Sequence, residues 1–162
     1  MQISLEIAHT IEQFEAAKNI FKTYADFLGL DLEFQGFSQE LEQIQSIYGV
    51  PKGCLILAKV NGEYAGAVGL REFKSNINSN VMNIAEMKRM FVLKKYHGYG
   101  LGKLLCKEFI DNAKKLGYTE IKLDSLTVLD KAVNLYKKFG FVEIEPYRYN
   151  PHPNVIYMGL KL

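Results

Sequence analysis

Three glycines at alternate positions, Gly98, Gly100 and Gly102, lie in the stretch YHGYGLGKLL, and an amphipathic run without further glycine follows them. We expect a helix there from about residue 100 to Leu116, ended by Gly117. The first turn of a helix has backbone N–H groups without partners and the positive end of the helix dipole. Because glycines let a ligand approach the backbone closely, this loop predicts an anion site, best suited to phosphates.

The loop pattern needs its context, because G-x-G-x-G is also compatible with a simple tight turn. The motif G-x-x-x-x-G-K-[ST] does not fit, since Leu104 follows Lys103 in place of a hydroxyl residue. The dinucleotide fingerprint G-x-G-x-x-G fails on spacing, and the strand before the loop comes late in the chain. Basic residues outnumber acidic ones across residues 87–115, which favours an anionic ligand, although two solvated helix faces would show the same bias.

Composition indicates an ordinary globular protein and a single domain over residues 1–162. Hydrophobic residues make up 48% of the chain, charged residues 23%, and the net charge is +2, which argues against a dedicated nucleic-acid-binding protein. Cys54 and Cys106 lie in apolar settings without metal-site spacing, so we expect buried reduced thiols and no metal. The chain opens with no signal-like segment and has no apolar run of membrane-spanning length, so we expect a cytoplasmic protein without membrane contact.

Hydrophobic periodicity, turn residues and caps divide the chain into strands and helices. In the first half of the chain we expect a strand at 3–8, a helix at 11–28 capped by Thr10, a shorter helix around 38–48, and a hairpin of strands 53–60 and 63–73 that turns at Asn61-Gly62. A polar loop at 75–80 and a strand within 81–93 follow, and then the helix after the glycine loop. The last elements are a strand at 119–126, a helix at 130–140 with Asp130 as a possible cap, and strands at 141–147 and 155–162. The helix between strands 81–93 and 119–126 permits a parallel pair, whereas the hairpin and the tail are antiparallel. This order predicts an α/β fold with a mixed sheet and helices on both faces.

The string EMKRMFVLKKYHGYGLGKLL, followed by AVNLYKKFGF, resembles the GCN5-related N-acetyltransferases, which use acetyl-coenzyme A. The family signature R/Q-x-x-G-x-G/A is matched at Gly100 and Gly102, and the order of elements is also the family's. The later helix of the family is matched by Ala132, Tyr136, Gly140 and Phe141. The resemblance covers most of the chain, is weakest over residues 25–50, and implies the acyl-CoA N-acyltransferase fold, in which one parallel strand pair is splayed.

The resemblance also implies where the coenzyme binds. The amide and carbonyl of Val92 are expected to hold the pantetheine, and an amide near Met90 or Phe91 is expected to face the thioester oxygen. The implied coenzyme-binding residues are Met90, Phe91, Val92, His97, Gly98, Tyr99, Gly100, Leu101, Gly102 and Lys103. The sequence departs from the family at His97, where Arg or Gln is usual, and at Leu129, where an Asn often binds pantetheine, so that contact is expected to be absent.

Two residues are candidates for acid–base catalysis. The resemblance places the Tyr136 hydroxyl at the coenzyme sulfur, where it would protonate the departing thiolate; the alternative is a core aromatic residue. Glu86 lies six residues before Val92, a spacing at which several relatives carry a general base. The alternative for Glu86 is an ion pair with Lys88, which alternation places on the same strand face.

The expected activity is direct transfer of acetyl from acetyl-CoA to a primary amine, with a degenerate acyl-CoA-binding module as the alternative. The family's acceptor site implies Phe34, Tyr147, Tyr149 and His152 as substrate-binding residues, although an exposed polar turn explains the tail equally well. At this length we expect a small-molecule acceptor, possible homodimers and no nucleic-acid partner. The acidic N-terminal third predicts a cationic acceptor, unless those acids merely solvate helix faces.

Overall fold

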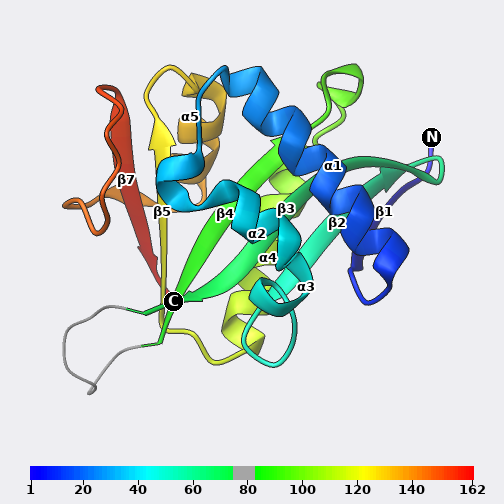
Figure 1. The fold of residues 1–162 in the computed structure, drawn as a ribbon, viewed down its shortest axis with the longest axis horizontal. Coiled ribbons are helices and arrows are strands. Elements are labelled where there is room, and N and C mark those ends of the chain that lie inside the picture. Colours follow the sequence, from blue (N-terminus) through cyan, green and yellow to red (C-terminus); the bar gives the residue numbers. More distant parts are fainter. Residues whose placement is uncertain (75–82) are drawn as a thin grey trace.

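The computed structural model describes residues 1–74 and 83–162. Within them the strands form one sheet in the order β1-β2-β3-β4-β5-β7-β6, with helices against it (Figure 1). The elements are β1 (Ile3–Ile7), α1 (Ile11–Leu28), η1 (Glu33–Gln35), α2 (Phe37–Glu42), α3 (Ile44–Ile47), β2 (Cys54–Val60), β3 (Glu63–Phe73), β4 (Ile84–Val92), η2 (Lys94–Tyr96), α4 (Leu101–Lys115), β5 (Glu120–Leu126), α5 (Asp130–Lys138), β6 (Val142–Glu143) and β7 (Val155–Lys161).

Local signals in the sequence account for most of these boundaries. Thr10 and Gln13 form a capping box at the start of α1, and Gly29 ends that helix in the left-handed conformation. Asn61 and Gly62 have φ of 50° and 83°, which is the geometry of the predicted hairpin turn. The helix expected around 38–48 is instead divided into α2 and α3, because Gln43 leaves helical geometry with φ −107° and ψ 23°.

Two further expectations need correction. Asp130 is the first residue of α5 rather than its cap, and Leu129 occupies the cap position. The strand expected over 141–147 is reduced to the two residues of β6, because the chain then turns away from β7. The polar loop expected at 75–80 lies outside the described residues, as does the start of the segment 81–93.

Helices cover both faces of the sheet, as the sequence predicted (Figure 1). Side chains alternate along β2, so Leu55 and Leu57 join the core beneath α1, α2 and α3, while Ile56 and Ala58 join the core beneath α4 and α5. The sheet is therefore a layer between two apolar cores, and its central strands have no solvated face. Within the described residues no helix is both long enough and apolar enough to span a membrane.

Among the described strands one pair is parallel, β4 and β5, and it opens along its length. Pairing is limited to Ile84–Glu86 against Glu120–Lys122, and both strands continue several residues beyond it. On its other side β4 contains a bulge, because two of its residues, Arg89 and Met90, lie opposite Val68 of β3. Arg89 has φ 58° there. The bulge and the open pair place the second half of β4 at the centre of the candidate site.

Candidate active site

A cavity of about 430 Å³, here called the splay cavity, lies where β4 and β5 separate. It is lined by Tyr24 and Phe27 of α1, by Met90, Phe91 and Val92 of β4, by His97, Gly98 and Gly102 of the glycine loop, by Ser125 of β5, by Val128 and Leu129 after that strand, and by Asp130, Lys131, Ala132, Leu135 and Tyr136 of α5. Most of this lining is apolar or backbone. The sequence prediction that β4, the glycine loop and Tyr136 meet at one place agrees with this geometry.

The glycine loop presents unpaired backbone N–H groups at the start of α4. The first helical hydrogen bond there is donated by the Leu104 N–H to the Gly100 carbonyl. In the described part of the chain, no acceptor contacts the N–H groups of residues 98–103. Gly98 and Gly100 have φ of 89° and 77°, and a Cβ at either position would have no atom within 4 Å. The loop is therefore open, strain-free only with glycine, and rich in donors for an anion.

His97 holds the loop against the end of β4. Its Nε2 lies 2.8 Å from the carbonyl oxygen of Val92, the same oxygen that the sequence assigned to pantetheine. The imidazole thus connects the glycine loop to β4, and any ligand that uses the Val92 carbonyl must share it with His97 or displace the ring. His97, which stands where the family usually has Arg or Gln, therefore has a structural role: it holds the glycine loop to the end of β4.

Two tyrosines enter the splay cavity from opposite sides. Tyr136 of α5 is 6% exposed, and its hydroxyl makes no hydrogen bond to the described residues. Burial raises the pKa of Tyr136 well above its usual value, so the phenol stays protonated and able to donate. Tyr24 of α1 packs on Phe91, with 5.3 Å between ring centroids, and was not singled out from the sequence. Burial also raises the pKa of Tyr24.

The remaining predicted coenzyme residues do not line this cavity. The side chain of Leu101 is buried in the core at 1% exposure, while Tyr99 is 45% exposed and packs beside Tyr96. Gly100 and Lys103 are exposed and do not belong to the lining of the cavity. The burial of Leu101 rules out a role for its side chain, so this residue can offer an anion only its backbone N–H.

A second, small cavity adjoins the first on the side of α1 and η1. This inner cavity has a volume of about 40 Å³ and shares Tyr24 and Ser125 with the splay cavity. Its polar lining centres on Asp124 of β5, whose Oδ2 accepts hydrogen bonds from Gln35 at 3.2 Å and from Asn150 at 2.9 Å. The Nζ of Lys88 lies 4.0 Å from Asp124 Oδ1 and donates to Gln35 at 2.9 Å.

The bulge in β4 explains why two adjacent charged residues, Lys88 and Arg89, are buried on the same side of the sheet. Lys88 contacts η1 and β5, and its neighbour Arg89 forms a buried ion pair with Glu40 of α2 at 3.0 Å. The side chains of two successive residues therefore lie on the same face of the sheet. Burial, reinforced by Arg89, lowers the pKa of Lys88 to about 7 against the opposing effect of Glu86 and Asp124. Lys88 is therefore an amine that exchanges protons near neutral pH inside the candidate site.

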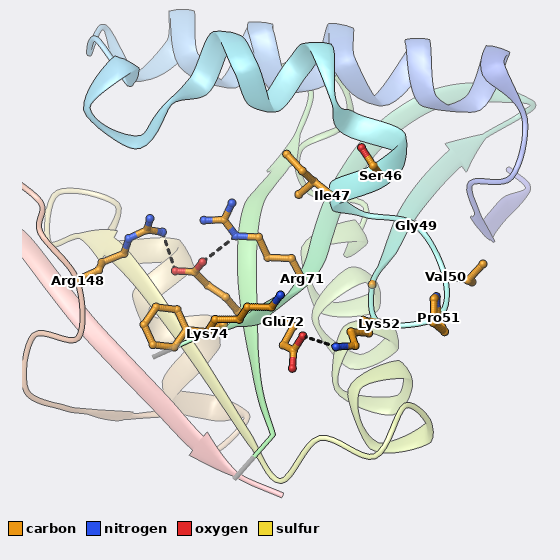
Figure 2. A pocket seen from close by; sticks show the side chains of 13 residues that line it. Ser46, Ile47, Gly49, Val50, Pro51, Lys52, Arg71, Glu72, Lys74 and Arg148 are labelled. Atoms are coloured by element: carbon orange, nitrogen blue, oxygen red, sulfur yellow. Dashed lines mark hydrogen bonds and ion pairs between the residues drawn. The ribbon is translucent and has the colours of Figure 1, made fainter. Parts of the chain in front are cut away.

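A third cavity, of about 560 Å³, lies beside the first half of β4, between α3, β3 and the segment before β7 (Figure 2). We call it the arginine cavity because Arg71 and Arg148 converge in it on Glu86. Arg71 Nε donates to one Glu86 oxygen at 2.9 Å, and Arg148 Nη1 donates to the other at 2.8 Å. The Tyr147 hydroxyl donates to that second oxygen at 2.7 Å.

Glu86 is thus the centre of an ion-pair cluster, and its expected role as general base needs correction. Burial alone would raise the pKa of Glu86, but Lys88, Arg148 and Arg71 outweigh that effect and lower it to about 2. A carboxylate with such a low pKa is a weak proton acceptor at neutral pH. The ion-pair alternative describes the geometry better, although its direct partners are the two arginines and not Lys88.

The residues expected to bind the acceptor separate into three groups. Phe34 and His152 line the inner cavity, where their rings pack edge to face with centroids 5.2 Å apart and His152 Nε2 is buried without a hydrogen-bond partner among the described residues. The hydroxyl of Tyr147 donates its hydrogen bond to Glu86. Tyr149 is 75% exposed and lines none of the three cavities, so its expected role is not supported by the structure.

The acidic residues of the N-terminal third also lie elsewhere. Glu12, Glu15 and Glu42 are exposed on helix surfaces, and Glu40 forms a buried ion pair with Arg89. None of them lines the three cavities, so the expectation of a cationic acceptor loses its structural basis. Across the described residues there is no cluster of three or more His, Cys, Asp or Glu side chains suited to a metal ion.

Sequence reasoning missed Arg71, Asp124 and Arg148, and it treated Lys88 only as a partner for Glu86. A usable signal existed for Arg71 and Lys88, since the charges in GLREF and EMKRM interrupt strands that are otherwise mostly apolar. Charged residues are rarely buried unless they are paired, so such interruptions mark paired charges. The sequence could not show which of them meet.

The sheet of this α/β protein opens at one parallel pair, and the donor-rich glycine loop lies beside the opening. The family model described as Acetyltransferase (GNAT) family matches residues 16–141. An uncharacterised N-acetyltransferase of Schizosaccharomyces pombe is 37% identical over 99% of this chain and 95% of its own length. The chain belongs to the GNAT acetyltransferase family.

Solved structures agree on the fold. An acetyltransferase of the GNAT family from Staphylococcus aureus superposes with a TM-score of 0.77 at 22% identity, covering 99% of both chains. The Salmonella typhimurium protein yncA, a putative acetyltransferase solved with its cofactor acetyl-CoA, superposes with a TM-score of 0.70 at 14% identity over 98% of this chain and 93% of its own. These likenesses extend over nearly the whole chain.

Proposed function

We propose that this protein transfers acetyl from acetyl-CoA to the nitrogen of a primary amine. One observation carries the proposal: Gly98 and Gly102 of the donor-rich loop, the open edge of β4 and Tyr136 line one cavity, and that cavity adjoins a second one with a buried carboxylate and amine. The loop would hold the coenzyme pyrophosphate through its N–H groups. The edge of β4 beyond Glu86, which has no partner from β5, would hold the pantetheine.

Transfer is proposed to be direct, without an acetylated enzyme. Burial raises the pKa of both Cys54 and Cys106 to about 12, so neither thiol provides a thiolate at neutral pH. Neither cysteine lines the splay, inner or arginine cavity. The amine would therefore attack the thioester carbonyl itself, and backbone donors near Met90 would stabilise the oxyanion because they are fixed before charge develops.

The inner cavity suits the reacting amine. Asp124 is positioned to bind an ammonium group, and Lys88 beside it exchanges protons near pH 7. We assign Lys88, in its neutral form, as the group that takes the proton from the acceptor, in place of Glu86. After the carbon–sulfur bond breaks, the Tyr136 hydroxyl would protonate the thiolate, as a neutral phenol at the wall of the splay cavity can do. An acceptor that enters as an ammonium loses two protons: Lys88 would take one, and the other would return the Tyr136 phenolate to a phenol.

The test is acetyl-CoA-dependent thiol release with a panel of primary amines, combined with mass spectrometry of the acceptor. The proposal predicts that released thiol and N-acetylated amine appear in equal amounts. Acetyl-CoA binding with no turnover of any amine would favour the alternative, an acyl-CoA-binding module without catalysis. Thiol release without an acetylated amine would indicate hydrolysis and would contradict the proposal.

A further inference from the structure

The inner cavity and the arginine cavity differ in volume by about an order of magnitude. At about 40 Å³ the inner cavity has room for an amino group, since a water needs only about 10–15 Å³ of such space, but not for a whole acceptor. The arginine cavity of about 560 Å³ lies beside it, because Glu86 lines the arginine cavity and Lys88, two residues further along β4, lines the inner one. Over residues 1–74 and 83–162 the two linings share no residue, so an acceptor that uses both cavities must extend from Lys88 past Glu86.

The arginine cavity has the electrostatics of an anion site. Its ionisable lining comprises Lys52, Arg71, Lys74 and Arg148 against Glu72 and Glu86. Lys52 and Glu72 neutralise each other at 3.1 Å, and Glu86 neutralises only one of the two arginines. Figure 2 shows Arg71 and Arg148 entering the cavity from opposite sides. The balance left for a ligand is positive.

Exposure shows which charges a ligand would meet. The Glu86 side chain is 1% exposed, whereas the side chains of Arg71 and Arg148 are 22% and 20% exposed. Arg71 uses Nε for Glu86, and its two terminal nitrogens have no hydrogen-bond partner among the described residues. The carboxylate is covered, and the guanidinium groups face the cavity. A guanidinium presents parallel donors that match a carboxylate.

We infer that the acceptor amine also carries a carboxylate, which Arg71 and Arg148 bind in the arginine cavity; this inference rests on the proposed acetyl transfer. The strand supplies a length scale. Lys88 and Glu86 are two residues apart on one strand, about 7 Å, so the carboxylate lies roughly that far from the reacting nitrogen. Dipeptides and ω-amino acids of about six carbons have this reach, whereas the α-amine and α-carboxylate of a single amino acid are too close together.

The experiment compares kcat/KM for 6-aminohexanoate and n-hexylamine, which differ only in the carboxylate. Wild-type protein is expected to prefer 6-aminohexanoate by about ten- to a hundredfold, the worth of charge-assisted hydrogen bonds. Arg71→Gln should abolish most of that preference, because kcat/KM falls more for 6-aminohexanoate than for n-hexylamine. Arg71→Lys should restore only part of it, because lysine lacks the planar fork. Lys107→Gln, which removes a surface cation paired with Asp111, should leave the preference unchanged.

Urea unfolding of each variant shows whether it is folded. Equal kcat/KM for the two acceptors, or a preference that persists in Arg71→Gln, would overturn the inference and leave acetyl transfer standing. If no amine is acetylated, the proposed function fails, and calorimetry of 6-aminohexanoate with the wild-type protein and CoA still decides the anion site. Binding that is lost in Arg71→Gln supports the carboxylate site, and absence of binding to wild-type protein rejects it.

Discussion

Acid unfolding distinguishes the ion-pair role of Glu86 from a general-base role, since the two differ in the direction of the pKa shift. The folded pKa of Glu86 is about 2 instead of 4.5, and its side chain is 1% exposed. A difference of about 2.5 units corresponds to about 3 kcal/mol of differential stabilisation, at about 1.4 kcal/mol per unit. Because the folded pKa is depressed, this stability is present above pH 4.5 and is lost as the pH falls toward 2.

The measurement is urea unfolding of wild-type and Glu86→Gln protein at pH 7 and pH 3. By pH 3 the unfolded carboxylate is nearly all protonated and the folded one is not, so about 2 kcal/mol of the Glu86 contribution is gone. Wild-type protein should therefore lose about 2 kcal/mol more than the variant between the two pH values. At pH 7 the variant should be less stable by about 3–5 kcal/mol, since both arginines lose their buried partner.

Asp111→Asn is a matched control, because it removes a carboxylate that pairs with Lys107 on the surface of α4. Its effect on the pH dependence should be much smaller, as exposed pairs contribute little. If Glu86→Gln instead leaves the loss between pH 7 and pH 3 unchanged or larger, the pKa of Glu86 is not depressed. The ion-pair account would then be wrong, and a general-base role would be viable again.

Three other predictions follow from the same geometry. Tyr136→Phe should lower kcat by about ten- to a thousandfold with nearly unchanged acetyl-CoA affinity; if Tyr24→Phe causes that loss instead, Tyr24 is the proton donor. Gly69→Ala should destabilise the fold by about 1–3 kcal/mol in urea unfolding, because its Cβ would lie 2.5 Å from the Tyr48 ring; wild-type stability would contradict this packing. The folded pKa of Lys88 is about 7 against 10.5, so the stability of wild-type protein should rise relative to that of Lys88→Met between pH 7 and 10; equal pH dependence in the two proteins would refute the shift.

The elements that carry their own local signals were predictable from the sequence. Thr10 and Gly29 mark the two ends of α1, and Asn61-Gly62 marks the hairpin, because capping and left-handed turns depend on a few adjacent residues. The glycine loop before α4 belongs to the same class. These signals, together with the family resemblance, were sufficient to place β4, the loop and α5 around one site.

The polar half of the site depends on contacts between distant residues, which no local pattern encodes. Glu86 is 15 positions from Arg71 and 62 from Arg148. The bulge at Arg89 changes the alternation of β4, so a count of strand positions could not predict that Lys88 and Arg89 serve the same face. The general-base expectation for Glu86 failed for this reason, since its pKa is set by partners that only the tertiary fold brings together.

Calorimetric titration of acetyl-CoA into wild-type, Gly100→Asp and Gly117→Asp protein tests the coenzyme site most directly. Both glycines have positive φ, 77° and 89°, and open space around a Cβ, but they lie at opposite ends of α4. A carboxylate at position 100 would repel the pyrophosphate from the N–H groups of residues 98–103. We predict an affinity loss of at least about a hundredfold for Gly100→Asp, about 2.7 kcal/mol, and less than threefold for Gly117→Asp. Equal affinities in two folded variants would contradict the placement of acetyl-CoA on this loop.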